Sequence, residues 1–185
     1  MGNIKKLMIK QLFYILLISH FISVSYGYST ARKIGDVMQL ALPITALSST
    51  YYINDTDGTK SFFKSYLTTV SMTYVIKEIS QKRRPDGSDY LSFPSGHTSS
   101  AFAGASFVHF RYGFKYSIPL YFLASFTGYS RVESDKHYVE DVLAGAGLAI
   151  LSSWYFTSPY NKNTIGLGYD PKSNTIQFNL IKYFK

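Results

Sequence analysis

Long stretches of mainly apolar residues, broken by polar clusters that contain Gly or Pro, run through the middle of the chain. Their spacing predicts five helices, over residues 34–53, 61–84, 97–113, 116–131 and 138–156. Pro43 predicts a kink in the first helix, and Pro85 with the DGSD that follows predicts the end of the second. NDTDGTK at 54–60 predicts a turn, and Gly113 predicts the end of the third helix. Small residues at 101–105 and 144–147 would let helices approach closely.

The character of the chain changes after Pro159. Apolar and polar residues alternate at 163–169 and in part at 175–184, and DPKSN between them is typical of a turn. The tail, residues 161–185, therefore predicts a short β-hairpin, either a terminal flap or an edge that contacts a partner. The expected fold class is all-α, a bundle of about five or six helices over residues 28–160, with this hairpin as an addition.

The N-terminus has a pattern of its own. Three lysines precede the apolar run LFYILLISHFISVSYG, and small residues lie near 23–27. This order is typical of a secretory signal peptide over residues 1–27, and an uncleaved signal anchor is the alternative. His20 lies inside this segment and is excluded from the chemistry. We therefore expect an exported protein, in the periplasm or on the periplasmic face of the membrane.

Two other runs without charge, residues 37–54 and 142–161, approach the length of about 20 apolar residues that a membrane span needs. Both contain polar residues, and the mean hydropathy of the chain is −0.02. The sequence favours a water-soluble or peripherally bound bundle, and an integral membrane bundle is the open alternative.

The amino-acid composition limits the classes of function that the chain can have. The chain has 185 residues, of which 46% are apolar, so it can form a core and is not a disordered tail. It has no cysteine, which excludes disulfides and thiolate catalysis. Its net charge of +8 would suit a phosphate substrate or an anionic lipid surface, although a solvated basic surface is the simpler interpretation. Nucleic acid is not an expected partner, because no basic stripe with a nucleic-acid motif is present.

Residues 130–141 hold the first candidate site. Asp141 follows His137 by four residues, so on a helix its carboxylate could orient one ring nitrogen and leave the other as a nucleophile. An ordinary surface pair is the simpler interpretation of these two residues alone. Arg131 offers a guanidinium fork that suits phosphate oxygens.

Two further stretches suit an anion. In PSGH, Ser95 is a candidate N-cap, Gly96 lets the backbone approach a ligand, and His97 could give a proton to a leaving oxygen. A plain loop and cap is the alternative. Lys77 and Arg84 lie seven residues apart, which on a helix points them the same way, and both bind phosphate readily. Lys82 and Arg83 are interpreted as charges that complement the helix dipole.

Taken in order, these residues form one long pattern: Lys77-x6-Arg84-Pro85, then Pro94-Ser95-Gly96-His97, then Ser130-Arg131-x5-His137-x3-Asp141. The pattern resembles the three-part signature of the type 2 phosphatidic acid phosphatase (PAP2) and vanadium haloperoxidase superfamily. The resemblance covers about residues 75–160, with a compatible helical flank upstream, and every position of the signature is filled.

The resemblance implies a role for each residue. His137 would be the nucleophile that forms a phosphohistidine, Asp141 would orient it, and His97 would be the general acid. The phosphate cradle would consist of Lys77, Arg84, Ser95, Gly96 and Arg131, with Ser130 in a supporting position. Neither a metal nor another cofactor is expected. His109 matches no signature position and is interpreted as structural.

The expected function is hydrolysis of a phosphomonoester or diphosphate of a membrane lipid, of the phosphatidic acid or undecaprenyl diphosphate type. A soluble acid phosphatase of broad specificity is the main alternative, and a vanadate-dependent haloperoxidase fits poorly because those enzymes are usually much longer. A non-catalytic envelope protein that binds lipid is a third alternative, which the complete set of His, Asp and Arg residues argues against. The expected partners are a phosphorylated lipid and the membrane surface.

Overall fold

The computed structural model describes residues 30–160, 164–170 and 175–181. Within these residues five helices follow one another: α2 (Thr30–Tyr52), α3 (Thr56–Ser80), α4 (Gly96–Tyr112), α5 (Phe114–Glu133) and α6 (Val139–Phe156). Two antiparallel strands follow, β1 (Thr164–Asp170) and β2 (Thr175–Ile181), paired from Thr164 with Ile181 to Asp170 with Thr175. The all-α class and the helical bundle are confirmed, and so is the hairpin. The predicted signal segment, residues 1–27, lies outside the described residues.

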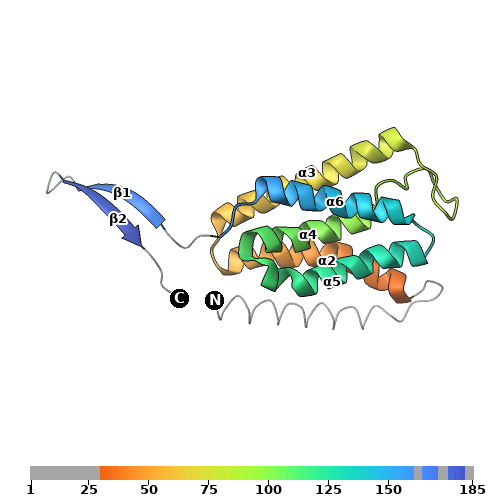
Figure 1. Ribbon diagram of the computed structural model, residues 1–185, viewed down its shortest axis with the longest axis horizontal. Helices are drawn as coiled ribbons and strands as arrows, with labels where there is room; N and C mark the ends of the chain where they lie inside the picture. The colour runs from red at the N-terminus through yellow and green to blue at the C-terminus, as the bar shows by residue number, and fades with distance from the viewer. Residues whose placement is uncertain (1–29, 161–163, 171–174, 182–185) are drawn as a thin grey trace.

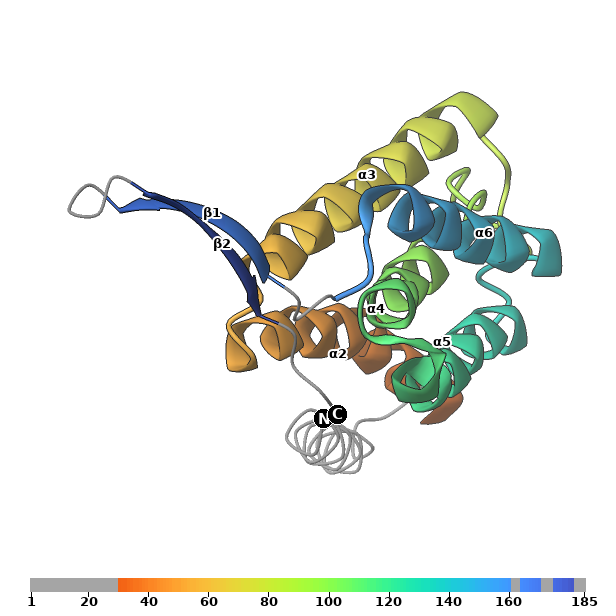
Figure 2. The ribbon, with the colours of Figure 1, turned by 60° about the vertical axis from the view of Figure 1, so that its left-hand side comes forward.

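Helix α4 lies at the centre of the bundle, in contact with each of the other four helices (Figures 1 and 2). Small residues make this possible: Ala101, Ala103 and Ala105 are almost wholly buried. At Gly104, an added Cβ atom would lie 2.6 Å from the backbone of Leu42 in α2. Only glycine allows the two backbones to lie so close, so the sequence run at 101–105 does determine the packing, as predicted.

The apolar core lies around α4 and consists of side chains from four helices. Met38 and Leu42 come from α2, Phe62 from α3, Phe107 from α4 and Leu120 from α5. Phe62 and Phe107 pack edge to face, with ring centroids 5.2 Å apart. This packing orders the scaffold on which the polar end of the bundle is built.

Two helix boundaries differ from the prediction in ways that matter for function. Helix α3 begins at Thr56 because Asp55 caps it, accepting a hydrogen bond from the backbone N–H of Gly58 at 2.9 Å. It ends at Ser80 rather than at Arg84, because Gln81 adopts a left-handed conformation (φ 44°). Residues 81–84 therefore leave the helix and form part of a loop. Pro43 lies inside α2, which continues on both sides of it.

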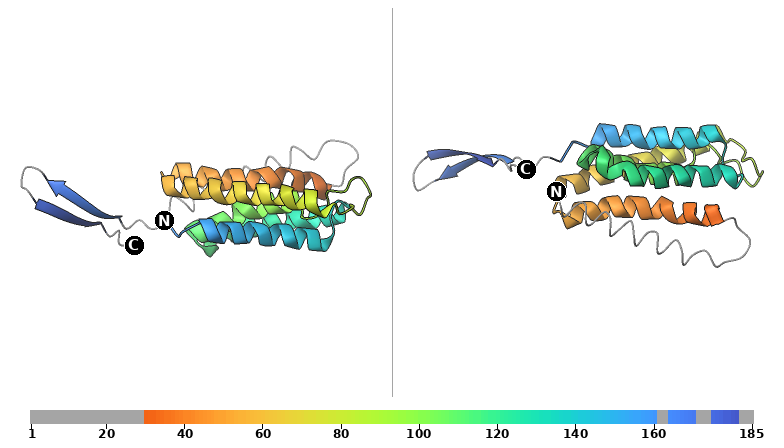
Figure 3. Two further views of the ribbon diagram at one scale, coloured as in Figure 1. Left: turned by 90° about the horizontal axis from the view of Figure 1, so that it is seen from above. Right: turned by 60° about the horizontal axis from the view of Figure 1, so that its bottom comes forward.

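The end of α3, the start of α4, the end of α5 and the start of α6 lie at the same end of the bundle (Figure 3). Their connecting loops, residues 81–95 and 134–138, meet there. Lys136 pairs with Asp86 across the two loops, and the Asp86 N–H donates to the carbonyl of Asp135 at 3.0 Å. All three signature stretches are therefore brought to one place. Within the described helices, no helix combines the length and apolar character needed to cross a bilayer.

Candidate active site

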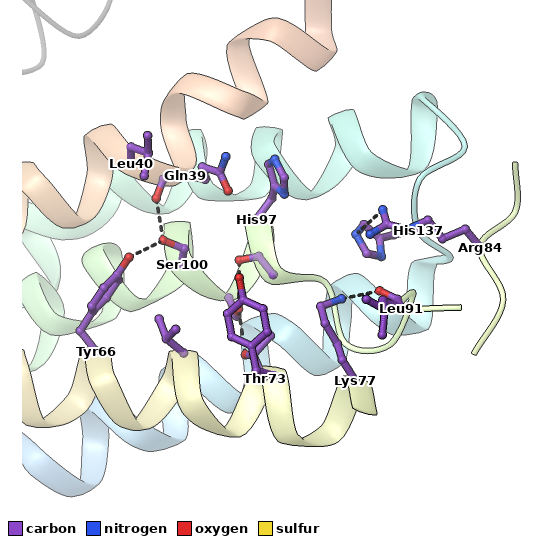
Figure 4. A pocket seen from close by; sticks show the side chains of 14 residues that line it. Gln39, Leu40, Tyr66, Thr73, Lys77, Arg84, Leu91, His97, Ser100 and His137 are labelled. Carbon is purple, nitrogen blue, oxygen red and sulfur yellow. Dashed lines mark hydrogen bonds between the residues drawn. The ribbon is translucent and has the colours of Figure 1, made fainter. Parts of the chain in front are cut away.

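A cavity of about 370 Å³ opens where these loops meet the helices, and Figure 4 shows its side chains. Residues of all three signature stretches line it. Toward one end lie two histidines and two cations, and further along lie Leu40 of α2 and Tyr66 of α3 with polar side chains between them. The lining residues are Gln39, Leu40, Tyr66, Val70, Thr73, Tyr74, Lys77, Arg84, Leu91, Gly96, His97, Ser99, Ser100 and His137.

Lys77 and Arg84 both line the cavity, but not for the reason that the sequence suggested. Only Lys77 is on α3, in its last turn, and Arg84 reaches the cavity from the loop. The Arg84 Nε donates to Asp89 at 2.6 Å, and its Nη1 lies 3.4 Å from His137 Nε2. The expectation that the two cations point the same way along one helix is therefore wrong, although the tertiary fold brings them together.

The ammonium of Lys77 is buried against backbone rather than against a carboxylate. Its Nζ donates to the carbonyl of Leu91 at 2.6 Å. Burial, with the nearby Arg84, lowers the pKa of Lys77 to about 8, although Asp141 and Asp89 act in the opposite direction. An anion in the cavity would stabilise the charged form of this lysine.

PSGH begins α4 as the sequence predicted. Ser95 is the N-cap, and its buried hydroxyl accepts from the N–H of Thr98 at 3.4 Å and from the Thr98 hydroxyl at 3.0 Å. Gly96 and His97 line the cavity, whereas Ser95 is not among the lining residues. At Gly145 of α6, an added Cβ would lie 2.6 Å from the Ser95 carbonyl, so α6 packs directly on this helix start.

His97 has a partner that sequence reasoning missed. Its Nε2 lies 2.9 Å from Oδ1 of Asp36, on α2. Burial and the charge of Arg131 lower the pKa of His97 to about 4, against the raising effect of Asp36. Without a bound ligand, the His97 imidazole is therefore neutral at pH 7.

Arg131 shares that same carboxylate. Its Nη1 donates to Asp36 Oδ1 at 2.7 Å, its Nη2 to the carbonyl of Arg32 at 2.7 Å, and its Nε to the hydroxyl of Ser130 at 3.1 Å. Arg131 is only 2% exposed and is not among the cavity-lining residues. Arg131 thus contacts the same carboxylate as His97 and ties α5 to α2, and Ser130 supports its guanidinium.

His137 and Asp141 are close, but they do not share a helix. Helix α6 begins at Val139, so His137 precedes it, and Asp141 accepts from the backbone N–H of Tyr138 at 3.0 Å as part of the helix cap. His137 Nδ1 lies 3.7 Å from Asp141 Oδ2 and has no hydrogen-bond partner of normal geometry. Its Nε2 is on the side of Arg84 and the cavity.

Burial and the charges of Lys77 and Arg84 lower the pKa of His137 to about 3, while the Ser92 carbonyl and Asp141 act in the opposite direction. A neutral ring is the form that can act as a nucleophile. The predicted pair therefore exists as a buried, uncharged imidazole beside a carboxylate.

Lys82 was interpreted as a charge that complements a helix dipole, and that interpretation is wrong because α3 ends before it. Its Nζ lies 2.7 Å from Asp141 Oδ1 and 2.7 Å from Glu140 Oε1. Ser92 donates to Asp141 Oδ2 at 2.5 Å. Neither Lys82 nor Ser92 was connected with Asp141 from the sequence, because both are far from Asp141 along the chain.

His109, by contrast, is structural as predicted. Its Nδ1 lies 3.1 Å from the Tyr121 hydroxyl, and its ring stacks on Phe110. Among the described residues, no cluster of three or more His, Cys, Asp or Glu side chains could hold a metal ion.

Comparison with known proteins identifies the family. The PAP2 superfamily matches residues 11–165. The lipid A 4'-phosphatase of Helicobacter pylori (strain J99) is 30% identical over 148 residues, which cover 74% of this chain and 74% of that enzyme. A lipid A 1-phosphatase of Porphyromonas gingivalis is 49% identical over 71 residues, which cover 37% of this chain and only 16% of that enzyme.

One solved structure shares the fold. The crystal structure of Aquifex aeolicus LpxE has a TM-score of 0.53 and 19% identity, and the match covers 76% of this chain and 92% of that one. The family match begins at residue 11, inside the segment predicted as a signal, so cleavage there stays a prediction. The resemblance carried by the three signature stretches is confirmed: the chain belongs to the PAP2 superfamily and is a PAP2-type phosphatase.

Proposed function

We propose that this enzyme removes a phosphate group from a phosphorylated lipid of the envelope, through a phosphohistidine on His137. The observation that carries this proposal is the two-part character of the cavity (Figure 4). Lys77, Arg84 and His137 lie toward one end in Figure 4, with His97 nearby, and Leu40 and Tyr66 lie toward the other, beside the polar Gln39 and Ser100. Val70 and Tyr74 also line the cavity. A substrate with a phosphate at one end and apolar groups at the other fits both parts.

The names of the related enzymes suggest which class of lipid is the substrate. The names of the Helicobacter and Porphyromonas enzymes make lipid A, a phosphorylated glycolipid, the leading candidate substrate. Phosphatidic acid and undecaprenyl diphosphate, the types expected from the sequence, remain candidates to be tested beside it.

The geometry supports a first step of in-line displacement. His137 Nε2 attacks phosphorus, the bond from phosphorus to the lipid oxygen breaks, and that oxygen takes a proton from His97. Lys77 and Arg84 stabilise the charge on the equatorial oxygens of phosphorus. Because the pKa of free His97 is lowered, the substrate phosphate itself must favour the protonated imidazole on binding.

The second step restores the enzyme. His97, now neutral, takes a proton from a water molecule as that water attacks phosphorus, and the bond from phosphorus to His137 nitrogen breaks. Inorganic phosphate leaves, and His97 carries the proton needed for the next cycle. Throughout, Asp141 faces the Nδ1 side of His137, where a carboxylate stabilises the positive charge of the phosphorylated ring.

Exposed apolar side chains beside the cavity support contact with a lipid surface. Leu40 and Ile44 of α2 and Leu67 of α3 are 58%, 61% and 59% exposed. Such groups on the helices that border the cavity suit a membrane surface better than bulk water. With the basic and apolar pattern of residues 1–27, this leads us to propose a site on the periplasmic side of the membrane.

A substrate panel tests the proposal. The purified full chain is offered lipid A, phosphatidic acid, undecaprenyl diphosphate and p-nitrophenyl phosphate, and released phosphate is measured. We expect kcat/KM for at least one lipid to exceed that for p-nitrophenyl phosphate, and vanadate to compete with the substrate. Preference for the water-soluble ester would favour the broad-specificity alternative, and no release from any substrate would favour a non-catalytic protein.

A further inference from the structure

The carboxylate of Asp141 is completely buried, and three hydrogen-bond donors contact it. Lys82 Nζ lies 2.7 Å from Oδ1, while the Ser92 hydroxyl and the Tyr138 N–H donate to Oδ2 at 2.5 and 3.0 Å. Two of these donors are neutral, so Lys82 supplies the positive charge in direct contact with the carboxylate. A buried carboxylate stays charged only when such partners compensate for the loss of water.

The backbone conformation of residues 81–82 positions Lys82 beside Asp141. The left-handed turn at Gln81 takes the chain out of α3, and the carbonyl of Lys82 accepts from the N–H of Ser92 at 2.9 Å. The ammonium lies 4.3 Å from the centre of the Tyr138 ring and 2.7 Å from Glu140 Oε1. Lys82 is thus half-buried, and its ammonium is held by two carboxylates and an aromatic ring, unlike that of a solvated surface lysine.

We propose that Lys82 is a positioning residue for the phosphatase reaction: its ion pair with Asp141 keeps that carboxylate charged and directed at the Nδ1 side of His137. Lys82 is not among the residues that line the cavity, so it acts through Asp141 and not on the substrate. The inference rests on the proposed phosphohistidine mechanism, and it gives a role to one of the six unspecified positions between Lys77 and Arg84.

The electrostatics agree with the geometry. Burial alone would raise the pKa of Asp141, but the hydrogen bonds from Lys82, Ser92 and Tyr138 outweigh it, and the pKa is lowered. Without Lys82 the carboxyl would take up a proton at higher pH. A protonated Asp141 carries no charge to stabilise the phosphorylated ring of His137, so turnover would fall on the acid side.

Among the described residues, several charged or titratable groups face Asp141 from the surrounding elements. They are Lys77 on α3, Lys82 on the loop that follows, His137 before α6 and Glu140 on α6. Glu140 also pairs with Lys82 but is 64% exposed, so it provides a matched control: its removal changes a partner of Lys82 without touching the carboxylate.

The first experiment compares Lys82→Met, Lys82→Arg and Glu140→Gln in the full chain, with kcat and KM measured from pH 4 to 9. For Lys82→Met we expect the acid limb of kcat to move up by about 1–3 pH units, since an adjacent cation lowers a carboxyl pKa by that amount. Near pH 8 its kcat should approach that of the wild type, and KM should change little. Lys82→Arg and Glu140→Gln should keep the wild-type limb. An unmoved limb in Lys82→Met, or a loss confined to KM, overturns the proposal.

A second readout needs no turnover. Aspartate labelled with ¹³C at the carboxyl carbon is titrated by NMR, and Asp141 is assigned by the signal lost in Asp141→Asn. We expect the Asp141 titration to move to higher pH in Lys82→Met and to stay in place in Glu140→Gln. If the NMR shift appears in an enzyme that hydrolyses no lipid phosphate, the proposed function fails while the Lys82–Asp141 pairing stands. If Asp141 titrates alike in Lys82→Met and the wild type, the inference itself is overturned.

Discussion

The two ends of the helical bundle both bury charged side chains, but they differ in how fully those side chains are paired within the protein. At the end away from the cavity, Arg111 donates to both oxygens of Asp55, at 2.7 and 2.5 Å. The hydroxyl of Tyr112 and the N–H of Gly58 donate to the same carboxylate at 3.0 and 2.9 Å, and Arg111 Nη1 donates to the Ser158 carbonyl at 2.8 Å. Charge and hydrogen bonds are satisfied within the protein.

At the cavity end, the Lys77 ammonium and the His137 ring are buried, and no described residue of opposite charge is in direct hydrogen-bond contact with either. The Lys77 ammonium contacts carbonyl oxygens of Leu91 and Ser92, and Nδ1 of His137 lies buried without a normal hydrogen bond. The pKa shifts follow this division. The hydrogen bonds that Arg111 donates to Asp55 raise the pKa of Arg111, so its charged form is favoured, whereas burial lowers the pKa of Lys77 and of His137.

The comparison shows how a structural cluster of charged residues differs from a catalytic one. Both clusters combine buried Arg or Lys with Asp, and only the cluster at the cavity end adds histidines. At the cavity end the positively charged forms of Lys77, His97 and His137 are disfavoured, and a bound anion would relieve this. The end away from the cavity, called the closed end below, needs no added anion. There Asp55 already supplies the negative charge, in a bidentate ion pair with Arg111.

Removal of the nucleophile should give the largest effect. We expect His137→Ala to lower kcat by about four orders of magnitude or more, since no second residue can form the covalent intermediate. The closed end should be unaffected, so the unfolding midpoint should stay near that of the wild type. His109→Gln, at a structural histidine, is the matched control and should keep its activity. Retention of more than about a tenth of the wild-type rate would refute the assignment.

Breaking the closed end should instead reduce stability. Arg111→Ala leaves the carboxylate of Asp55 buried and uncompensated, so the free energy of unfolding should fall by about 3–5 kcal/mol. Urea unfolding measures this loss, and kcat per folded molecule should not change. The double variant Arg111→Met/Asp55→Leu, which removes both charges, should recover part of the loss. A single variant as stable as the wild type would show that this ion pair does not stabilise the fold.

Asp36→Asn probes the link between His97 and Arg131. The carboxylate raises the pKa of His97, so its loss should leave less protonated imidazole at any pH above about 4. We expect kcat/KM to fall about tenfold, which corresponds to roughly one pKa unit. A matched control is Asp57→Asn, whose carboxylate pairs with exposed Lys60. Equal kinetics in the two variants would show that Asp36 has no effect on His97.

The pH dependence of the wild type gives the mildest test. Because the pKa of His97 in the free enzyme is lowered to about 4, its protonated fraction falls as pH rises above that value. After correction for ionisation of the substrate, kcat/KM should therefore decrease from pH 5 to pH 8. The decline of kcat should begin at higher pH, because a bound phosphate stabilises the imidazolium. If kcat/KM instead rises over this range, His97 is not the acid.

The sequence predicted the five helices and the three signature stretches, because apolar spacing and local motifs carry both. It missed the end of α3, since Gln81 adopts a left-handed conformation that is uncommon for residues other than glycine. It also missed Asp36 and Lys82. Asp36 lies 61 residues from His97, and Lys82 lies 59 from Asp141, so only tertiary packing brings these pairs together.

The His137–Asp141 pair shows that a correct prediction can rest on a wrong local picture. The two residues were expected one turn apart on a helix, but His137 precedes α6 and Asp141 caps it. Their separation of 3.7 Å is set by the cap and by the loop that carries Ser92. Spacing in a signature therefore predicts proximity better than it predicts the element that produces it.

The most direct test of the mechanism is to locate the covalent intermediate. The wild-type enzyme is mixed with a ³²P-labelled lipid phosphate, quenched under denaturing alkaline conditions that preserve phosphohistidine, and digested for mass spectrometry. We predict an acid-labile phosphate on the peptide that contains His137, absent in His137→Ala and present in His109→Gln. Label on another residue, or turnover with no covalent phosphate at any quench time, would contradict the account.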